Sequence, residues 1–192
     1  DRAFMDGAIL RTHLMRPTWH FVTPADIRWL LRLTVPRVHA VNAYYYRKNE
    51  LDDATLNRCS DALTKALQGG KHLTRPELAA ALEQIGIMAS ELRLSLIMMY
   101  AELEGIICSG PRRCKQFTYA LLDEWVPPSR NLERDEALAE LTRRYFTSHG
   151  PATVEDFVWC SGLTKADAKV GLEMVKSHLT YEDIGGQTYW FS

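Results

Sequence analysis

The sequence contains the same order of structural signals twice, 79 residues apart. Thr74 and Glu77, and again Thr153 and Asp156, place an acidic residue three positions after a threonine. This spacing is typical of a helix N-terminus, where the two side chains bond backbone N–H groups of the first turn. A second helix signal and then alternating residues that predict a β-hairpin follow each pair. The chain is therefore predicted to contain two modules of similar architecture.

The predicted elements of the two modules correspond one to one. The first module is expected to have helices at 52–68, 74–85 and 90–103, with Ser90 as the cap of the last, and strands at 106–108 and 116–121. The second is expected to have helices at 133–149, 153–161 and 164–177, and strands at 179–184 and 187–191. Helices closed by a hairpin in this order are typical of the winged helix-turn-helix. We therefore expect a mainly α fold with small β-hairpins, arranged as a tandem winged helix-turn-helix.

Prolines divide the chain into predicted units. Pro127-Pro128-Ser129 marks a boundary, so residues 51–126 and 127–192 are predicted to be a second and a third winged helix. Residues 1–50 are then the remnant of a first winged-helix module. Within them the predicted elements are a helix at 5–15, a strand at 18–22, a helix at 24–33 opened by Thr23, and a helix at 36–48. Because Asp1 already lies in a predicted helix, we expect the chain to be a piece of a longer protein.

Charge is distributed unevenly along the chain. The 23 Lys and Arg residues nearly balance the 24 Asp and Glu residues, whereas proteins that bind nucleic acid by bulk electrostatics are usually far more basic. Residues 1–49, however, hold eight basic and three acidic side chains, and residues 109–119 hold three basic and no acidic ones. An anionic partner would contact these two segments. The alternative is that surface charge clusters by chance.

Several kinds of chemistry lack their sequence signature. The four cysteines form no CxxC pair, the six histidines form no HExxH motif, and glycine-rich phosphate-binding loops are absent. We therefore expect no metal, no cofactor and reduced cytoplasmic thiols. No run approaches the roughly 20 apolar residues of a membrane span, so no membrane contact is expected.

The predicted strand at 18–22 supplies the first candidate site. Side chains alternate along a strand, so Trp19 and Phe21 are expected in the core, while Thr18 and His20 face a cleft with Arg16 nearby. Arginine can bind a phosphate with two hydrogen bonds, and threonine and neutral histidine can bond a flipped nucleotide. The alternative interpretation makes His20 a satisfied core histidine and Arg16 a charge at a helix end.

Two further candidates carry clustered cations. The loop between the strands at 106–108 and 116–121 holds Arg112, Arg113 and Lys115, which suit phosphates or a minor groove, although an ordinary solvated hairpin tip would look the same. Lys165 and Lys169 lie four positions apart and share one face of their predicted helix. The helix at 90–103 is apolar around most of its circumference and acidic at its ends, which favours a structural role. Neither this helix nor the one at 164–177 offers the Arg, Asn or Gln cluster that reads bases.

One run of residues resembles a known family. The run combines arginines, a threonine pair and a histidine in the order Arg11, Thr12, Leu14, Met15, Arg16, Thr18, His20 and Val22. A second match comprises Gly150, Pro151, Thr153, Asp156, Phe157, Trp159, Ser161, Gly162, Leu163, Tyr189 and Trp190. On these residues the chain resembles the AlkZ-like family of bacterial tandem winged-helix proteins over nearly its whole length.

The resemblance implies a DNA-repair function. Some members are DNA glycosylases that remove alkylated or cross-linked purines, so the implied partner is damaged double-stranded DNA in the bacterial cytoplasm, at the nucleoid. The family's catalytic Gln-x-Gln or Gln-x-Asp precedes the first motif, and Gln68, Gln84 and Gln116 do not form it. We therefore expect the chain to be inactive alone, with its catalytic residues unidentified. The alternatives are a transcription-regulator-like DNA binder and a winged-helix module that binds protein.

Overall fold

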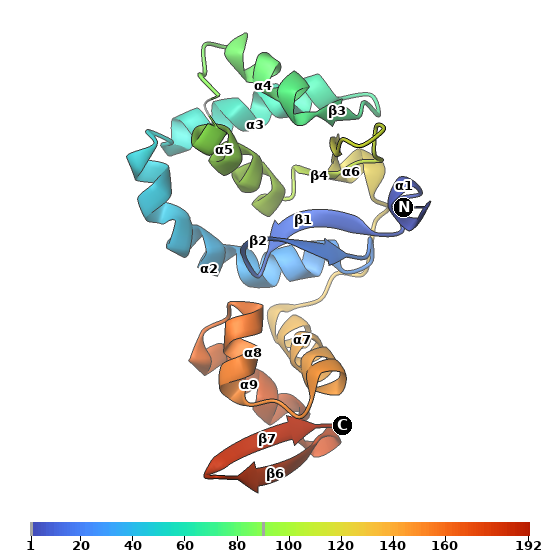
Figure 1. The fold of residues 1–192 in the computed structure, drawn as a ribbon, viewed down its shortest axis with the longest axis vertical. Helices are drawn as coiled ribbons and strands as arrows, with labels where there is room; N and C mark the ends of the chain where they lie inside the picture. Colours follow the sequence, from blue (N-terminus) through green and yellow to red (C-terminus); the bar gives the residue numbers. More distant parts are fainter. Residues whose placement is uncertain (1, 90) are drawn as a thin grey trace.

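The N-terminal part of the chain forms a β-hairpin rather than a helix. The structure, a computed structural model, describes residues 2–89 and 91–192 (Figure 1). Its first elements are a short helix and two antiparallel strands: α1 (Arg2–Met5), β1 (Leu10–Leu14) and β2 (Arg16–Val22). The strand predicted at 18–22 is confirmed within β2, but the helix predicted at 5–15 is wrong. Leu10 and Leu14 are four positions apart, a spacing that fits one face of a strand as well as one face of a helix.

The two helices predicted at 24–33 and 36–48 are one continuous helix, α2 (Ile27–Lys48), with Pro36 inside it. Proline has no N–H for the helical bond and usually ends a helix. Here buried side chains lie on both sides of the proline, among them Thr34 and Val38, each 1% exposed, so packing holds the helix together. The helix begins after Asp26 rather than at Thr23, whose hydroxyl instead donates to the Asp26 carboxylate over 2.8 Å.

The middle of the chain contains the predicted helices and strands in the predicted order, together with a short strand and a short helix that were not predicted. Its elements are four helices and three strands: α3 (Asp53–Leu67), β3 (Leu73–Thr74), α4 (Arg75–Glu83), α5 (Glu91–Leu103), β4 (Ile107–Ser109), β5 (Thr118–Leu121) and α6 (Leu122–Trp125). The strands form an antiparallel sheet in the order β3-β5-β4. The capping box predicted at Thr74 and Glu77 is confirmed, with the Thr74 N–H donating to Glu77 over 2.7 Å. The predicted cap Ser90 lies outside the described residues.

The C-terminal part repeats this order and forms a lobe below the rest of the chain in Figure 1. Its elements are three helices, a short 3₁₀ turn and a hairpin: α7 (Arg134–His149), α8 (Val154–Ser161), α9 (Lys165–Val175), η1 (Lys176–His178), β6 (Thr180–Ile184) and β7 (Gln187–Phe191). The capping box at Thr153 and Asp156 is confirmed as well. A single bridge between Ala152 and Trp190 takes the place that β3 has in the middle part.

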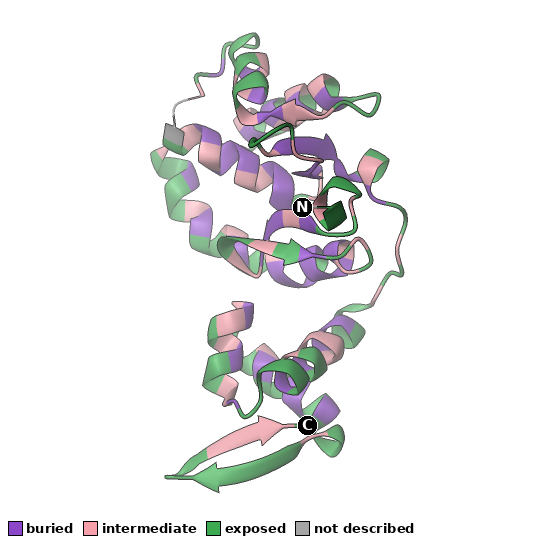
Figure 2. Cartoon of the chain, turned by 45° about the vertical axis from the view of Figure 1, so that its right-hand side comes forward, coloured by how far each residue is buried: buried purple, intermediate pink, exposed green. Residues whose placement is uncertain are grey.

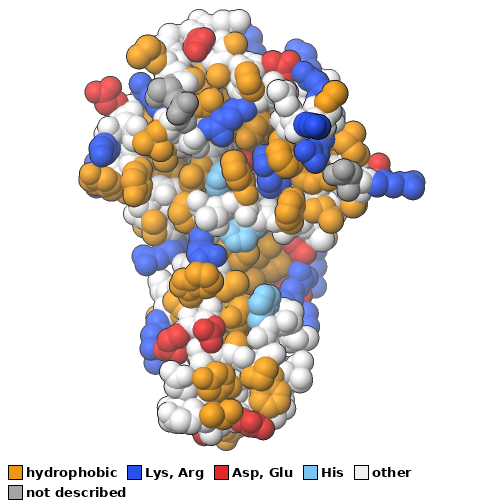
Figure 3. All heavy atoms as spheres, in the orientation of Figure 1, with side chains coloured by type: hydrophobic (Ala, Val, Ile, Leu, Met, Phe, Trp, Pro, Cys, Tyr) orange, Lys and Arg blue, Asp and Glu red, His pale blue; other side chains and the backbone are white. Residues whose placement is uncertain are grey.

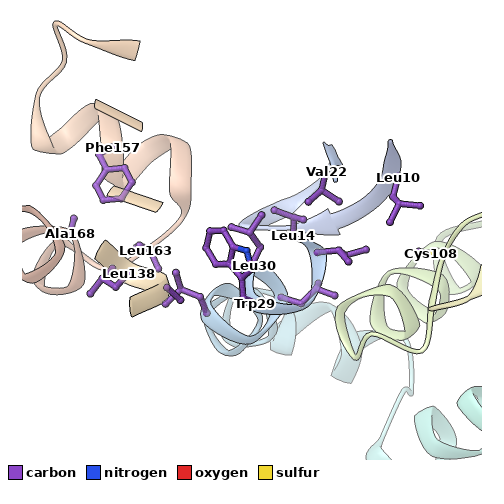
Figure 4. Close-up of a cluster of buried hydrophobic side chains, with 14 of the residues drawn as sticks. Leu10, Leu14, Val22, Trp29, Leu30, Cys108, Leu138, Phe157, Leu163 and Ala168 are labelled. Carbon is purple, nitrogen blue, oxygen red and sulfur yellow. The ribbon is translucent and has the colours of Figure 1, made fainter. Parts of the chain in front are cut away.

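A shared core connects the hairpin with the lower lobe. Leu14 and Trp29 from the N-terminal part pack into one cluster with Leu138 and Phe157 from the lower lobe (Figure 4). A second cluster lies between α3, α4, α5 and the β4–β5 pair and reaches Tyr46 near the end of α2. The N-terminal hairpin and α2 therefore lie between the two repeated parts and pack against both. No helix in the described ranges is long and apolar enough to cross a membrane.

Candidate nucleic-acid interface

The hairpin β1–β2 has one covered strand and one open strand. Strand β1 packs against α2, α5 and β4, and the Arg11 N–H donates to the Ser109 hydroxyl over 2.7 Å. Strand β2 pairs with β1 alone among the described strands. Its side chains apart from Val22 are exposed or half-buried.

The aromatic residues of β2 belong to this open face. Trp19 is 48% exposed and Phe21 is 70% exposed, so their predicted place in the core is wrong. Figure 2 shows in green that exposed residues also occur on the strands in the upper part of the molecule. The sequence analysis correctly predicted that the side chains of β2 alternate between two faces, but it assigned the aromatic side chains to the buried face instead of the exposed one. Leu10, Leu14 and Val22 already fill the space between the hairpin and α2, and the aromatic side of β2 has no further layer over it among the described elements.

Thr18 and His20 lie on the same side of β2 and contact each other. Thr18 is exposed and His20 is half-buried, with its Nδ1 3.0 Å from the Thr18 carbonyl oxygen. Nδ1–H is therefore the donor in this pair. Burial lowers the pKa of His20, and Arg16 adds to this effect while the Thr18 carbonyl opposes it. A neutral ring in this tautomer presents Nε2 as a hydrogen-bond acceptor.

Arg16 lies at the turn of the hairpin and reaches the lower lobe. Its guanidinium carbon is 4.3 Å from the ring centroid of Trp159 on α8, and Trp159 is 71% exposed. Since Arg16 belongs to a strand, the alternative interpretation as a helix-end charge is wrong. The five residue steps from Arg16 to Phe21 span about 17 Å along the strand.

The basic loop meets the opposite end of the hairpin. The guanidinium carbons of Arg112 and Arg11 lie 4.9 Å and 3.6 Å from the ring centroid of Phe117. Arg112 also donates to the carbonyl oxygen of Lys115 over 3.1 Å, and Lys115 itself is exposed. Residues 110–117 and the hairpin thus form one edge with cations at both ends. Figure 3 shows Lys and Arg side chains among hydrophobic and histidine side chains at the height of the hairpin.

Arg113 contacts the start of α4 rather than the ring of Phe117. Its guanidinium donates to the Glu77 carboxylate over 2.8 Å and to the His72 carbonyl over 2.5 Å. Bonds from the Thr74 N–H and hydroxyl, together with the bond from Arg113, lower the pKa of Glu77 to about 2. Arg113 therefore holds the loop against the start of α4, and its charge is compensated.

The two predicted lysines of α9 lie on another part of the surface. Lys165 and Lys169 line a groove of about 660 Å³ between α8, α9 and the β6–β7 hairpin, and Glu155 and Glu173 line it too. Lys165 forms an ion pair with Glu155 and thereby lowers the pKa of that carboxyl. The structure does not bring these lysines to the β1–β2 hairpin.

A buried hydrogen-bonded pair was missed by the sequence analysis. The Glu102 carboxylate is 1% exposed and bonds both the ring Nδ1 and the backbone N–H of His13, the latter over 3.2 Å. The sequence analysis placed Glu102 at the acidic end of a largely apolar helix, and it does lie in the last turn of α5, but its contact with His13 was not predicted. Because 89 residues separate the partners, no local pattern in the sequence could indicate the pair. The same holds for the contact between Arg11 and Phe117.

Metal-binding side chains are scattered in the fold. No group of three or more His, Cys, Asp or Glu side chains that could hold a metal occurs among the described residues. Cys59 and Cys108 are buried, Cys114 is exposed, and all four cysteines are free thiols.

Fold and sequence comparisons identify the class of protein. The architecture is mainly helical with small antiparallel sheets, and it is similar to that of the DNA glycosylase AlkZ of Streptomyces sahachiroi, with a TM-score of 0.77 at 22% identity. The match covers 99% of this chain and 54% of that one, so this chain spans about half the length of the solved relative. Residues 1–191 match the model of the AlkZ-like family, described as DNA glycosylase AlkZ-like. The chain belongs to this family, as the motifs predicted. No curated protein matches the sequence.

Proposed function

We propose that this chain binds double-stranded DNA through the DNA backbone, as the tandem winged-helix part of a glycosylase that excises alkylated or cross-linked purines from damaged DNA. One observation carries the proposal: Arg11 and Arg112 share the ring of Phe117, which joins the basic loop and the hairpin into one cationic edge. Backbone binding depends on such local cations rather than on net charge. Membership in the AlkZ-like family supports DNA as the partner.

The winged-helix interpretation is part of this proposal. The order α3, β3, α4, α5, β4, β5 with the sheet order β3-β5-β4 supports a wing at residues 110–117, and the order from α7 to β7 supports a second. The division at residues 1–50, 51–126 and 127–192 is proposed on the same basis. We also propose that the protein acts in the bacterial cytoplasm, at the nucleoid.

The helices at the usual groove-reading positions do not support sequence-specific reading. On α5 the side chains of Leu96, Ile97 and Met98 are at most 4% exposed. On α9, Lys165 is paired with Glu155. Thr18 and His20, between the two cationic ends of the edge, are proposed to bond sugar or base atoms rather than to select a sequence. Lys165 and Lys169 are proposed as auxiliary backbone contacts of the lower lobe.

A duplex titration at low salt tests the proposal. We expect the chain to bind unrelated duplexes with equal affinity, and the double variant Arg112→Glu/Lys115→Glu to weaken binding to all of them alike. Lys65→Glu, a charge reversal on the exposed side of α3, is the matched control and should leave affinity unchanged. No binding to any duplex would favour a protein-interaction module instead. A binding-site selection that returned one motif would favour a transcription regulator.

Catalysis is tested separately on an alkylated duplex. None of the glutamines of the chain forms the Gln-x-Gln or Gln-x-Asp motif that is catalytic in the family. We therefore propose that the chain binds such DNA without releasing the base. Released base in a chromatographic assay would show that the chain contains its own catalytic residues.

A further inference from the structure

Aromatic rings and guanidinium groups alternate across the hairpin and the basic loop. The guanidinium carbon of Arg11 lies 4.4 Å from the ring centroid of Trp19 and 3.6 Å from that of Phe117. Arg112 lies over the same Phe117 ring at 4.9 Å. Phe4 meets the edges of Phe117 and Phe21, with centroids 5.5 Å and 6.4 Å apart. We call this group, consisting of Phe4, Arg11, Trp19, Phe21, Arg112 and Phe117, the aromatic–arginine patch.

Contacts with buried neighbouring residues hold the patch in place. The Arg11 backbone bonds Ser109, and the Trp19 ring lies 4.9 Å from the ring of His13, which is bonded to buried Glu102. These contacts fix the directions of the arginine and the tryptophan before any ligand arrives. A site built in this way loses little side-chain entropy on binding.

Arg11 has a positive charge without a carboxylate partner in the described part of the chain. It is half-buried, its Nε has no hydrogen-bond partner in the described structure, and burial lowers its pKa. Of the acids beside the patch, Glu77 is bonded to Arg113 and one oxygen of Glu102 to His13, so Glu102 acts on the charge of Arg11 without forming an ion pair with it. Arg11 can therefore still bind an anion, and a phosphate group is a suitable one.

Phe21 supplies an open ring next to this cation. It lies directly opposite Arg11 in the register of the hairpin, and it is 70% exposed. Trp19, two positions along the same face, is 48% exposed. An exposed ring beside an arginine is the combination that single-strand-binding proteins use, because every base has a face that can stack on an aromatic side chain.

We propose that the aromatic–arginine patch binds an unpaired nucleotide of a DNA strand, with its phosphate on Arg11 and its base stacked on Phe21. The proposal rests on the proposed DNA-binding function and extends it from paired to unpaired DNA. A fully paired duplex keeps its bases stacked on one another, so it can use the cations of the patch but not its rings.

The test compares three labelled probes at the same low salt concentration: a 12-nucleotide thymidine strand, the same strand paired with its complement, and a duplex with one unpaired thymidine. We expect the chain to bind both unpaired probes more tightly than the paired duplex. Phe21→Ser should lower their affinity about five- to fifty-fold and change duplex affinity less than twofold. Phe21→Trp should retain the binding, since it keeps a ring at this position. Tyr44→Ser, which removes another exposed ring on α2, is the matched control and should have no effect.

The outcomes separate this inference from the proposed function. Equal affinity for all three probes, unaltered by Phe21→Ser, would overturn the inference and leave duplex binding intact. Binding to the unpaired probes without binding to the duplex would support the inference and contradict the proposed function. A dimer in sedimentation that dissociates in Phe21→Ser, without single-strand binding, would assign the patch to protein contact and overturn it.

Discussion

The carbonyl oxygen of Met15 lies where a side chain of Gly162 would begin. A methyl group added at Gly162 would be 2.0 Å from this oxygen, and Gly162 has a φ of +68° at the C-terminus of α8. The turn of hairpin β1–β2 and the end of α8 thus approach each other backbone to backbone. This contact and the cation–π contact of Arg16 with Trp159 join the lower lobe to the hairpin.

Gly162→Ala is therefore expected to destabilise the chain more than its backbone conformation alone explains. The left-handed conformation costs about 1 to 2 kcal/mol for alanine, and forced displacement of packed atoms adds about 1 to 3 kcal/mol. Gly186→Ala is the matched control, because Gly186 has a φ of +80° and no atom within 4 Å of an added methyl group. Chemical denaturation of both variants measures the difference. Equal losses of stability in the two variants would show that the hairpin and the lower lobe can move apart at Gly162 without a cost in free energy.

Loss of His13 is expected to be among the most damaging substitutions in the hairpin. His13→Leu leaves the Glu102 carboxyl group buried with a backbone N–H donor but without its ring partner, and leaving a buried polar group without a partner in this way costs about 1 to 3 kcal/mol. The double variant His13→Leu/Glu102→Leu removes both polar groups and should regain most of the loss. Urea unfolding of the four chains measures the coupling. If the double variant lost as much stability as the two single variants together, this would contradict a direct interaction between His13 and Glu102.

Arg112 and Arg113 are adjacent but are expected to respond differently to substitution. Arg113→Ala breaks the contacts with Glu77 and His72, so it should lower the melting temperature slightly and change duplex affinity less than twofold. Arg112→Ala should weaken duplex binding to a clearly greater extent than Arg113→Ala does, because Arg112 belongs to the cationic edge. Anisotropy titration and thermal unfolding of each variant give both quantities. If Arg113→Ala weakened binding as strongly as Arg112→Ala, then Arg113 would have to leave Glu77 when DNA binds.

The capping box of α4 makes stability depend on acid pH. The pKa of Glu77 is about 2 in the folded chain and about 4.3 in an unfolded one, so the unfolded chain binds the extra proton between these values. The stabilisation by Glu77 is therefore fully present above pH 4.3 and is lost as the pH falls through about 2. We expect Glu77→Gln to lower the melting temperature at pH 6 and to differ less from the wild type at pH 3. A constant difference between pH 6 and pH 3 would contradict the lowered pKa.

The sequence predicted those elements whose signals are local. The capping boxes at Thr74 and Thr153 and the β6–β7 hairpin depend on residues within a few positions of one another, and they were located correctly. The helix predicted at residues 5–15 failed because the same leucine spacing fits a strand, and only the pairing of β1 with β2 decides between the two. The break predicted at Pro36 failed because packing on both sides of the proline outweighs one missing hydrogen bond.

The site was predicted in part for the same reason. Arg16, Thr18, His20 and the basic loop could be proposed as candidates because they are close in sequence. Which face of β2 points outward depends on what covers it, and Trp19 and Phe21 were therefore placed on the wrong side. Arg11 and Phe117 are 106 positions apart along the chain, so their contact, which joins hairpin and loop, could not be predicted from spacing.

The salt dependence of duplex binding tests most directly whether the hairpin and the basic loop form one DNA-binding edge. A plot of the logarithm of affinity against the logarithm of salt concentration has a slope of about −0.9 for each phosphate neutralised. Arg16→Glu and Arg112→Glu, at opposite ends of the edge, should each reduce the slope by about 1, with the same reduction for unrelated sequences. Lys65→Glu should leave the slope unchanged. If the slopes were the same for the wild type and both edge variants, the hairpin and the basic loop would not form one DNA-binding edge.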